Sequence, residues 1–303
     1  MAISYVTYQD INKKKWDDCI DRAGNGVLYA YSFYLDTMSK NWDALVLNDY
    51  ETVMPLTWNK KYSIYYLYQP SFTACLGIFG NQLSSETINE FLKAVPAKFK
   101  YWDIYLNPGN FFKLTDFTLY ERMNYVLSLN GSYEHIYSRY RDNIKRNIKK
   151  AEQLGLLINK NISVAGVISM AKEQAQHFAD IPAADYKQFE TLYSLLYQKE
   201  KATTYGVYTK EGQLLASAVF FFSHGRAYYI LVGNHPNGKT LGASHALINA
   251  FIKDHAGQNI KLDFEGSDIS SLAFFYSSFG AVEEKYSAIR LNRLPGPLKW
   301  FKK

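Results

Sequence analysis

The sequence predicts an α/β (α+β) chain of two tandem domains, each with a mixed central sheet flanked by helices. Its 303 residues exceed the ~250 residues at which a single hydrophobic core usually stops growing. Residues 226–291 read as strand, turn, helix, strand, helix, strand, because aromatic and β-branched runs alternate with apolar residues at helical spacing. The order of elements in the first half recurs in the second half, which indicates an internal duplication.

The first half is expected to combine three helices with five strands. The helices are expected over 12–23, 31–42 and 84–98, and the strands over 44–48, 52–58, 63–69, 101–106 and 121–129. The third helix has serine at its expected cap and an acid in its first turn.

The second half repeats this order after turn residues at 130–132. Its helices are expected over 165–179, 185–201 and 243–255, and its strands over 205–209, 215–223, 226–233 and 260–264. These turn residues divide the chain into domains 1–130 and 131–303, and the second domain opens with a basic helix over 132–155.

Composition sets limits on partners and compartment. The net charge of +6 permits a phosphate-rich ligand without requiring one. Cys19 and Cys75 have no motif spacing, which suits a reducing compartment. No leader pattern and no apolar run of ~20 residues is found, so we expect a cytoplasmic protein without a membrane span. His235, His245 and His255 lie ten apart, a spacing that matches no set of metal ligands on one helix.

The turn between the strand at 226–233 and the following helix is a candidate anion site. Backbone amides at a strand-to-helix turn, together with the helix dipole, attract phosphate groups. The residues expected to bind a phosphate-bearing donor are Gly238, Lys239, Gly242, Ala243 and Ser244. A plain structural turn is the alternative, because the two glycines lie four residues apart.

The expected basic helix has an apolar ridge beside two largely cationic ridges. Ser132 and Gly155 stand where a helix cap and a terminal glycine are favoured. The cations expected to bind substrate phosphates are Arg141, Lys145, Arg146 and Lys149. The alternative is a solvated face whose long side chains cover apolar neighbours.

Two carboxylates near the end of the strand at 260–264 are candidates for acid–base chemistry. Asp263 and Glu265 flank Phe264, and we expect one carboxylate to point into a cleft while the other packs toward a helix. Glu265 at the strand terminus is the better candidate for taking a proton from an ammonium nucleophile. Equally, these residues can cap the next helix together with Ser267 and Asp268.

These features together resemble a known superfamily. Residues 226–291 resemble the core of the GNAT acyltransferase fold, in which the coenzyme A pyrophosphate sits on the turn opening the central helix. Residues 140–155 look like the basic helix of FemAB-like proteins, which carry two GNAT-type domains in tandem. Residues 262–266 and 274–281 look like the segment of that group with an aromatic, a catalytic lysine and a late Phe-Gly. The resemblance covers essentially the whole chain.

The chain departs from the family pattern at the catalytic lysine. Tyr276 occupies that place after Phe275. A phenol with an ordinary pKa of ~10 is neutral at neutral pH, so it can donate a hydrogen bond or protonate a leaving group but supplies no fixed positive charge. The alternative is a tyrosine that packs in the core or in a cleft wall.

The resemblance implies an N-acyltransferase that moves an acyl group from an activated donor to an amine. We expect no permanently bound cofactor and no metal, with acyl-CoA as the co-substrate because the lysine is missing. The acceptor is expected to be a small molecule or an envelope precursor. One alternative is an aminoacyl-tRNA-dependent FemAB-type peptidyltransferase acting on a cell-envelope precursor, with tRNA as a partner. Another is a non-catalytic GNAT-like module that binds an anionic ligand.

Overall fold

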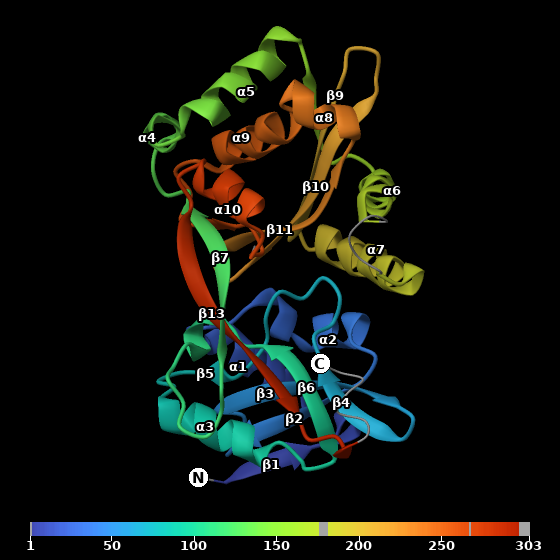
Figure 1. Cartoon of the computed structure of the whole chain (residues 1–303), viewed down its shortest axis with the longest axis vertical. Helices are drawn as coiled ribbons and strands as arrows, with labels where there is room; N and C mark the ends of the chain where they lie inside the picture. Colours follow the sequence, from blue (N-terminus) through green and yellow to red (C-terminus); the bar gives the residue numbers. More distant parts are fainter. Residues whose placement is uncertain (1, 176–180, 267, 297–303) are drawn as a thin grey trace. The chain divides into compact units, whose positions relative to one another are not determined.

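The computed structural model describes residues 2–175, 181–266 and 268–296, and these residues form two compact units (Figure 1). Unit 1 contains the residues up to Arg122 and those from Lys285 onward, and unit 2 is Met123–Glu284. This division differs from the expected one at residue 130, because strand β13 (Val282–Asn292) pairs with strand β6 (Phe99–Tyr105) of unit 1. The chain enters unit 2 within strand β7 (Tyr120–Ser128) and leaves it within β13.

Unit 1 is built on a mixed sheet. Its strands are β1 (Ile3–Val6), β2 (Trp42–Leu47), β3 (Thr52–Lys61), β4 (Ile64–Tyr68) and β6, in that spatial order, and the short β5 (Phe79–Gly80) pairs with β3. The β4–β6 pair is parallel, and the other neighbouring pairs, including β6–β13, are antiparallel. The helices are α1 (Lys13–Arg22), α2 (Ser32–Met38) and α3 (Ser85–Ala94). As expected, Ser84 caps α3 by accepting a hydrogen bond from the Thr87 N–H.

Unit 2 is built on a second mixed sheet in the order β7-β12-β11-β10-β9-β8. The strands not yet described are β8 (Leu157–Lys160), β9 (Ala202–Tyr208), β10 (Leu214–Ser223), β11 (Arg226–Asn234) and β12 (Lys261–Asp263). Only the β11–β12 pair of this series is parallel. The parallel pair arises because a helix crosses back between β11 and β12, whereas tight hairpins join β9, β10 and β11.

Helices cover both faces of the unit 2 sheet (Figure 1). Helix α9 (Ala243–His255) places Phe251 on Phe220 of β10, with ring centroids 3.8 Å apart. Helices α6 (Val164–Ala175) and α7 (Ala183–Gln198) lie on the other face, where Phe189 stacks on Phe221. Adjacent residues of a strand point to opposite faces, so Phe220 and Phe221 anchor the two helical layers.

The expected basic helix over 132–155 is two helices, α4 (Tyr133–Ser138) and α5 (Asp142–Gln153). The interruption has a tertiary cause, because the Arg141 N–H donates a hydrogen bond to the Ser278 carbonyl oxygen (2.9 Å) instead of continuing the helical ladder. Ser132 caps α4 and Gly155 has φ +66°, as expected at the two ends. The residues of the apolar ridge are buried on both sides of the interruption. They are Ile136, Tyr140, Ile144 and Ile148.

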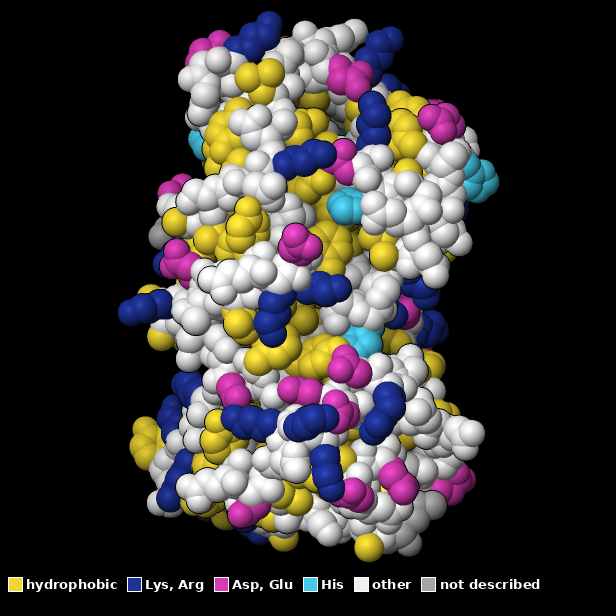
Figure 2. Space-filling model, turned by 180° about the vertical axis from the view of Figure 1, so that it is seen from behind, with side chains coloured by type: hydrophobic (Ala, Val, Ile, Leu, Met, Phe, Trp, Pro, Cys, Tyr) yellow, Lys and Arg dark blue, Asp and Glu magenta, His cyan; other side chains and the backbone are white. Residues whose placement is uncertain are grey.

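The candidate anion turn is itself helical. Residues Pro236–Leu241 form α8, Gly242 adopts the left-handed conformation, and α9 begins at Ala243. Helix α10 (Ser270–Ser277) follows β12. Among the described residues, no helix is long and apolar enough to cross a membrane. On the face shown in Figure 2, basic and acidic side chains are interspersed, in keeping with the modest net charge.

Candidate functional site

Strands β11 and β12 diverge where the candidate site lies. They pair over three residues only, Arg226–Tyr228 with Lys261–Asp263. The Phe264 N–H then bonds to the Tyr125 carbonyl oxygen (3.0 Å), while β11 continues against β10. A register shift makes Ile230 an extra residue of β11 and bends the strand at this point. The later part of β11 therefore has no β12 partner, and the chemistry-bearing residues of this region surround that divergence.

Asp263 is committed to a buried ion-pair network. Its Oδ2 lies 2.8 Å from Arg226 Nη1, and its Oδ1 accepts hydrogen bonds from Asn124 (2.9 Å) and from the Glu265 N–H (3.0 Å). Arg226 also holds Glu284 with two 2.7 Å hydrogen bonds. Both carboxylate oxygens of Asp263 thus have structural partners, and Asp263 positions the backbone of Glu265.

Glu265 and Tyr276 face the same region. Glu265 has φ +64°, a left-handed conformation that turns the chain sharply at the end of β12. Burial, and to a smaller extent the Glu265 carboxylate, raises the pKa of Tyr276 to about 12. The Tyr276 ring stacks on Phe264 with centroids 4.5 Å apart, and the residue is 8% exposed. The structure therefore brings together two of the three expected catalytic residues, with a neutral phenol beside a carboxylate.

The two glycines of the candidate anion turn are required by packing. A Cβ at Gly238 would lie 2.4 Å from the Leu215 carbonyl oxygen, and one at Gly242 would lie 2.5 Å from that of Asn147. Gly238 thus allows α8 to approach β10, and Gly242 allows the start of α9 to approach α5. Packing therefore offers a second explanation for the two glycines, besides the expected close approach of the backbone to a phosphate.

The remaining residues of the turn differ in burial and in hydrogen bonding. Ala243 is fully buried, and Ser244 donates a hydrogen bond to the Asn234 Oδ1 (2.6 Å), which ties α9 to the end of β11. No side chain caps the N-terminus of α9. The side chain of Lys239 lies outside the part of the chain that the structure describes.

The four expected phosphate-binding cations lie on or beside α5. The Arg141 guanidinium sits over the Phe274 ring at 4.9 Å, and Lys145 Nζ donates to the Ser138 carbonyl oxygen (3.3 Å). Arg146 and Lys149 are exposed. Within the described ranges, none of the four forms an ion pair with a carboxylate. Arg146 directly precedes Asn147, whose carbonyl oxygen lies next to Gly242, so the backbone of Arg146 is close to the start of α9.

Sequence reasoning missed His245 and Tyr140. His245 lies in the first turn of α9 against Phe275, with centroids 5.0 Å apart, and burial lowers its pKa to about 4. Its Nδ1 and the hydroxyl of Tyr140 are buried without a hydrogen-bond partner among the described residues. Both rings contact Phe279. Apolar spacing predicted Tyr140 only as a ridge residue, and histidine spacing predicted His245 only as a non-ligand, because a buried atom without a hydrogen-bond partner leaves no local signal in the sequence.

No group of three or more His, Cys, Asp or Glu residues in the described part of the chain is arranged to hold a metal ion. The polar groups near the strand divergence are instead a carboxylate, a neutral phenol and a neutral imidazole. Such a set can accept a proton and donate hydrogen bonds to a developing oxyanion.

Part of the chain matches a known protein family. Residues 138–268 match the family model of the Acetyltransferase (GNAT) domain. A search of the curated proteins finds no match.

Solved structures share the fold. FemX superposes over 100% of both chains with a TM-score of 0.65 and 14% sequence identity. L-PGS from Bacillus licheniformis has a TM-score of 0.54 at 12% identity, covering 95% of this chain and 94% of its own. A conserved protein of unknown function from Bacteroides thetaiotaomicron has a TM-score of 0.58 at 12% identity, covering 95% of this chain and 100% of its own. The chain therefore shares the fold of FemX, and residues 138–268 within it match a GNAT acetyltransferase domain.

Proposed function

We propose that the protein is an N-acyltransferase that uses acyl-CoA as donor and an amine as acceptor. This proposal rests on one observation. Strands β11 and β12, which directly precede and follow α9 in the chain, diverge, and the uncapped N-terminus of α9 packs against α5. The N-terminus of α9 and Arg146 supply positive potential for the donor's phosphates. The divergence is where an extended thioester arm can lie between strands.

The reaction needs few groups from the protein. Glu265 takes the proton of the acceptor ammonium, and the free amine attacks the thioester carbonyl carbon. A C–N bond forms, the C–S bond breaks, and the departing thiolate takes up the proton that the nitrogen loses as the amide forms. Tyr276, kept neutral by its raised pKa, donates a hydrogen bond to the developing oxyanion or to the leaving sulfur.

The donor assignment depends on Tyr276. In the tRNA-dependent members that the chain resembles, a lysine at this place supplies fixed positive charge. Here a neutral ring is 8% exposed and stacked on Phe264. The phenol suits a thioester, because a thiolate is a good leaving group that needs less charge compensation than an alkoxide.

Thermal unfolding with and without acetyl-CoA, free CoA and longer acyl-CoAs tests this proposal. A ligand at ~100 times its Kd adds about 2.7 kcal/mol to the free energy of unfolding, which raises the melting temperature by several degrees. We expect the shift to fall in Arg146→Ala and to persist in Lys187→Ala, which removes an exposed charge from α7. The absence of a shift with every CoA compound would refute the donor assignment.

A second candidate follows from the free cations of α5. Lys149 and Lys150 are exposed on the same helix as Arg146 and form no ion pair within the described ranges. Cations without acidic partners suit a longer polyanion, so an aminoacyl-tRNA donor is the alternative. Gel-shift titration with aminoacylated and deacylated tRNA at two salt concentrations distinguishes the candidates, since an acyl-CoA enzyme is expected to show no preference for the aminoacylated form.

A further inference from the structure

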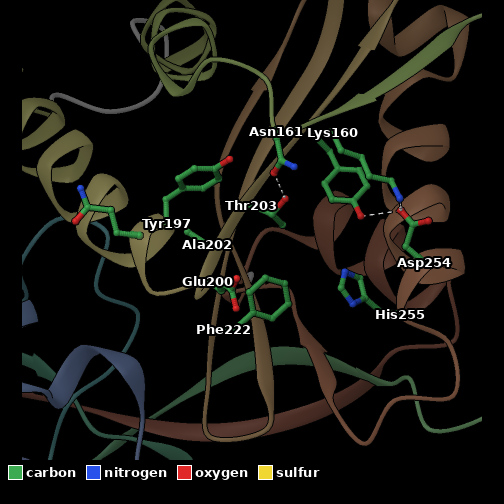
Figure 3. Close-up of a pocket in the computed structure, with 11 residues that line it drawn as sticks. Lys160, Asn161, Tyr197, Glu200, Ala202, Thr203, Phe222, Asp254 and His255 are labelled. Atoms are coloured by element: carbon green, nitrogen blue, oxygen red, sulfur yellow. Dashed lines mark hydrogen bonds and ion pairs between the residues drawn. The ribbon is translucent and has the colours of Figure 1, made fainter.

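A separate pocket of about 610 Å³ lies at the end of α9 opposite to Gly242 (Figure 3). Its walls come from β8, the end of α7, the start of β9, the end of β10 and the last turn of α9. All of its lining residues belong to unit 2. Helix α9 spans 13 residues, which at ~1.5 Å per residue separates this pocket from the candidate donor site by nearly the length of the helix.

The positive groups of the pocket are already neutralised. Lys160 Nζ lies 2.7 Å from Asp254 Oδ2, and the Tyr205 hydroxyl donates to the same oxygen at 2.7 Å. The His255 ring lies against Phe222 (5.5 Å) and Phe251 (4.3 Å), and burial lowers its pKa, so the imidazole is neutral. With its one lysine paired, this pocket offers no free positive charge to an anionic ligand.

One carboxylate in the pocket is not neutralised. Glu200 forms no ion pair with any residue in the described ranges, and in Figure 3 it lies beside the Phe222 ring. Tyr197, which is 47% exposed, supplies a second aromatic ring. A carboxylate beside one aromatic ring, with a second ring in the same pocket wall, attracts an organic cation through charge and through the negative faces of the rings.

The backbone at Glu200 is left-handed. The Glu200 N–H bonds to the Tyr197 oxygen (3.0 Å) and the Lys201 N–H to the Leu196 oxygen (2.8 Å), which is the pattern of a Schellman cap at the end of α7. Glu200 has φ +57° at the position that such caps usually give to glycine. A glutamate is strained in this left-handed conformation. Glycine would therefore be more stable than glutamate at this position.

We propose that this pocket binds a small organic cation, with the ligand's primary ammonium group on Glu200 and its apolar body between Tyr197 and Phe222. Hydrogen-bonding groups at the rim, Asn161 and Thr203, are joined at 3.0 Å and can contact polar substituents of the ligand. The site is separate from acyl transfer, and its occupancy does not depend on the identity of the donor.

Titration calorimetry of the full chain with phenethylamine tests the proposal. Phenethyl alcohol and hydrocinnamate serve as neutral and anionic analogues of the same shape. We expect binding of the amine only, with the Kd raised about tenfold in Glu200→Gln by loss of a charge-assisted hydrogen bond. Glu190→Gln removes an exposed charge from the same helix outside the pocket and is expected to leave the Kd unchanged.

A second variant separates binding from folding. Glu200→Gly is expected to raise the melting temperature, because glycine relieves the left-handed strain, while amine binding is lost. Equal binding of the three analogues, an unchanged Kd in Glu200→Gln, or no heat with the amine would each overturn the proposal. So would loss of binding in both Glu200→Gln and Glu190→Gln, which would indicate a general surface charge effect.

Discussion

Asp263 and Glu265 are separated by one residue, and the fold gives them different surroundings. Asp263 is 5% exposed and bonded to Arg226 and Asn124, whereas Glu265 is partly exposed beside Tyr276. Residues two apart share a face of a regular strand, so strand periodicity does not explain why the two carboxylates differ. It did not predict which one was neutralised, because Arg226 and Asn124 come from other strands.

Substituting these two carboxylates is expected to separate chemistry from stability. Glu265→Gln removes the proposed base and is expected to lower kcat by about 100-fold or more, with an unchanged melting temperature. Asp263→Asn weakens a buried ion pair and is expected to lower the melting temperature. The rate of thiol release from acyl-CoA and a thermal melt of each variant check this prediction. Full activity in Glu265→Gln would remove Glu265 from the mechanism.

The Glu284 carboxylate predicts a pH dependence of stability. Burial alone would raise its pKa, but hydrogen bonds from Arg226 and that residue's charge outweigh burial and lower the pKa below the ordinary 4.5. A carboxylate with a depressed pKa in the folded state stabilises the protein above its unfolded pKa, and this stabilisation is lost as pH falls through the folded value. The stability of the wild type is therefore expected to fall as pH drops below 4.5.

Urea unfolding of Glu284→Gln across that range is the measurement. The variant is expected to be less stable than the wild type at neutral pH, and the difference is expected to shrink below pH 4.5. Glu152→Gln, an exposed position on α5, is the control and should follow the wild type. A stability difference that stays constant with pH would contradict the assigned role of Glu284.

At the scale of elements, Gly242 joins α9 to α5. It has φ +76°, and a Cβ there would meet the Asn147 carbonyl oxygen at 2.5 Å. Gly212 is a matched control, with φ +87° and no atom within 4 Å of an added Cβ. Both alanine variants bear the backbone strain, but only Gly242→Ala must also push α5 away.

We expect Gly242→Ala to lower the free energy of unfolding by about 1–3 kcal/mol more than Gly212→Ala does. Urea unfolding followed by far-UV circular dichroism measures the difference. Equal losses in the two variants would show that the contact between α9 and α5 is not tight.

The local elements of unit 2 were largely predictable, and their interruptions were not. Apolar spacing located the ridge from Ile136 to Ile148, and turn residues located the hairpins of β9, β10 and β11. The break between α4 and α5 depends on a bond from Arg141 to Ser278, and the bulge at Ile230 depends on its pairing with β10. A pattern along the chain carries no information about such distant partners. The same limit hid the network around Asp263.

At the scale of the whole molecule, the two units carry different spectroscopic probes. The chain has five tryptophans, and none of them lies in residues 123–284, which form unit 2. Tryptophan fluorescence therefore reports on unit 1, while circular dichroism reports on both units.

A core substitution in one unit is expected to shift the unfolding signal of that unit more than the signal of the other. Ile289→Ala in β13 removes a 1% exposed side chain from the unit 1 core and is expected to cost about 2–5 kcal/mol. The fluorescence transition should then move to lower urea. Leu262→Ala in β12, where the side chain is 0% exposed, should shift the circular dichroism transition and leave fluorescence nearly unchanged. Equal shifts of both signals in both variants would mean that the two units unfold together.

The return of β13 to unit 1 has a consequence for synthesis on the ribosome. Strand β6 cannot gain its β13 neighbour until the segment Ala288–Asn292 has emerged. Unit 2 is continuous in sequence, so all of its residues leave the exit tunnel before the sheet of unit 1 can be completed. The unit translated first is therefore the last to finish folding. Until then the free edge of β6 can pair with other chains, and chaperones or rapid translation must protect it from aggregation.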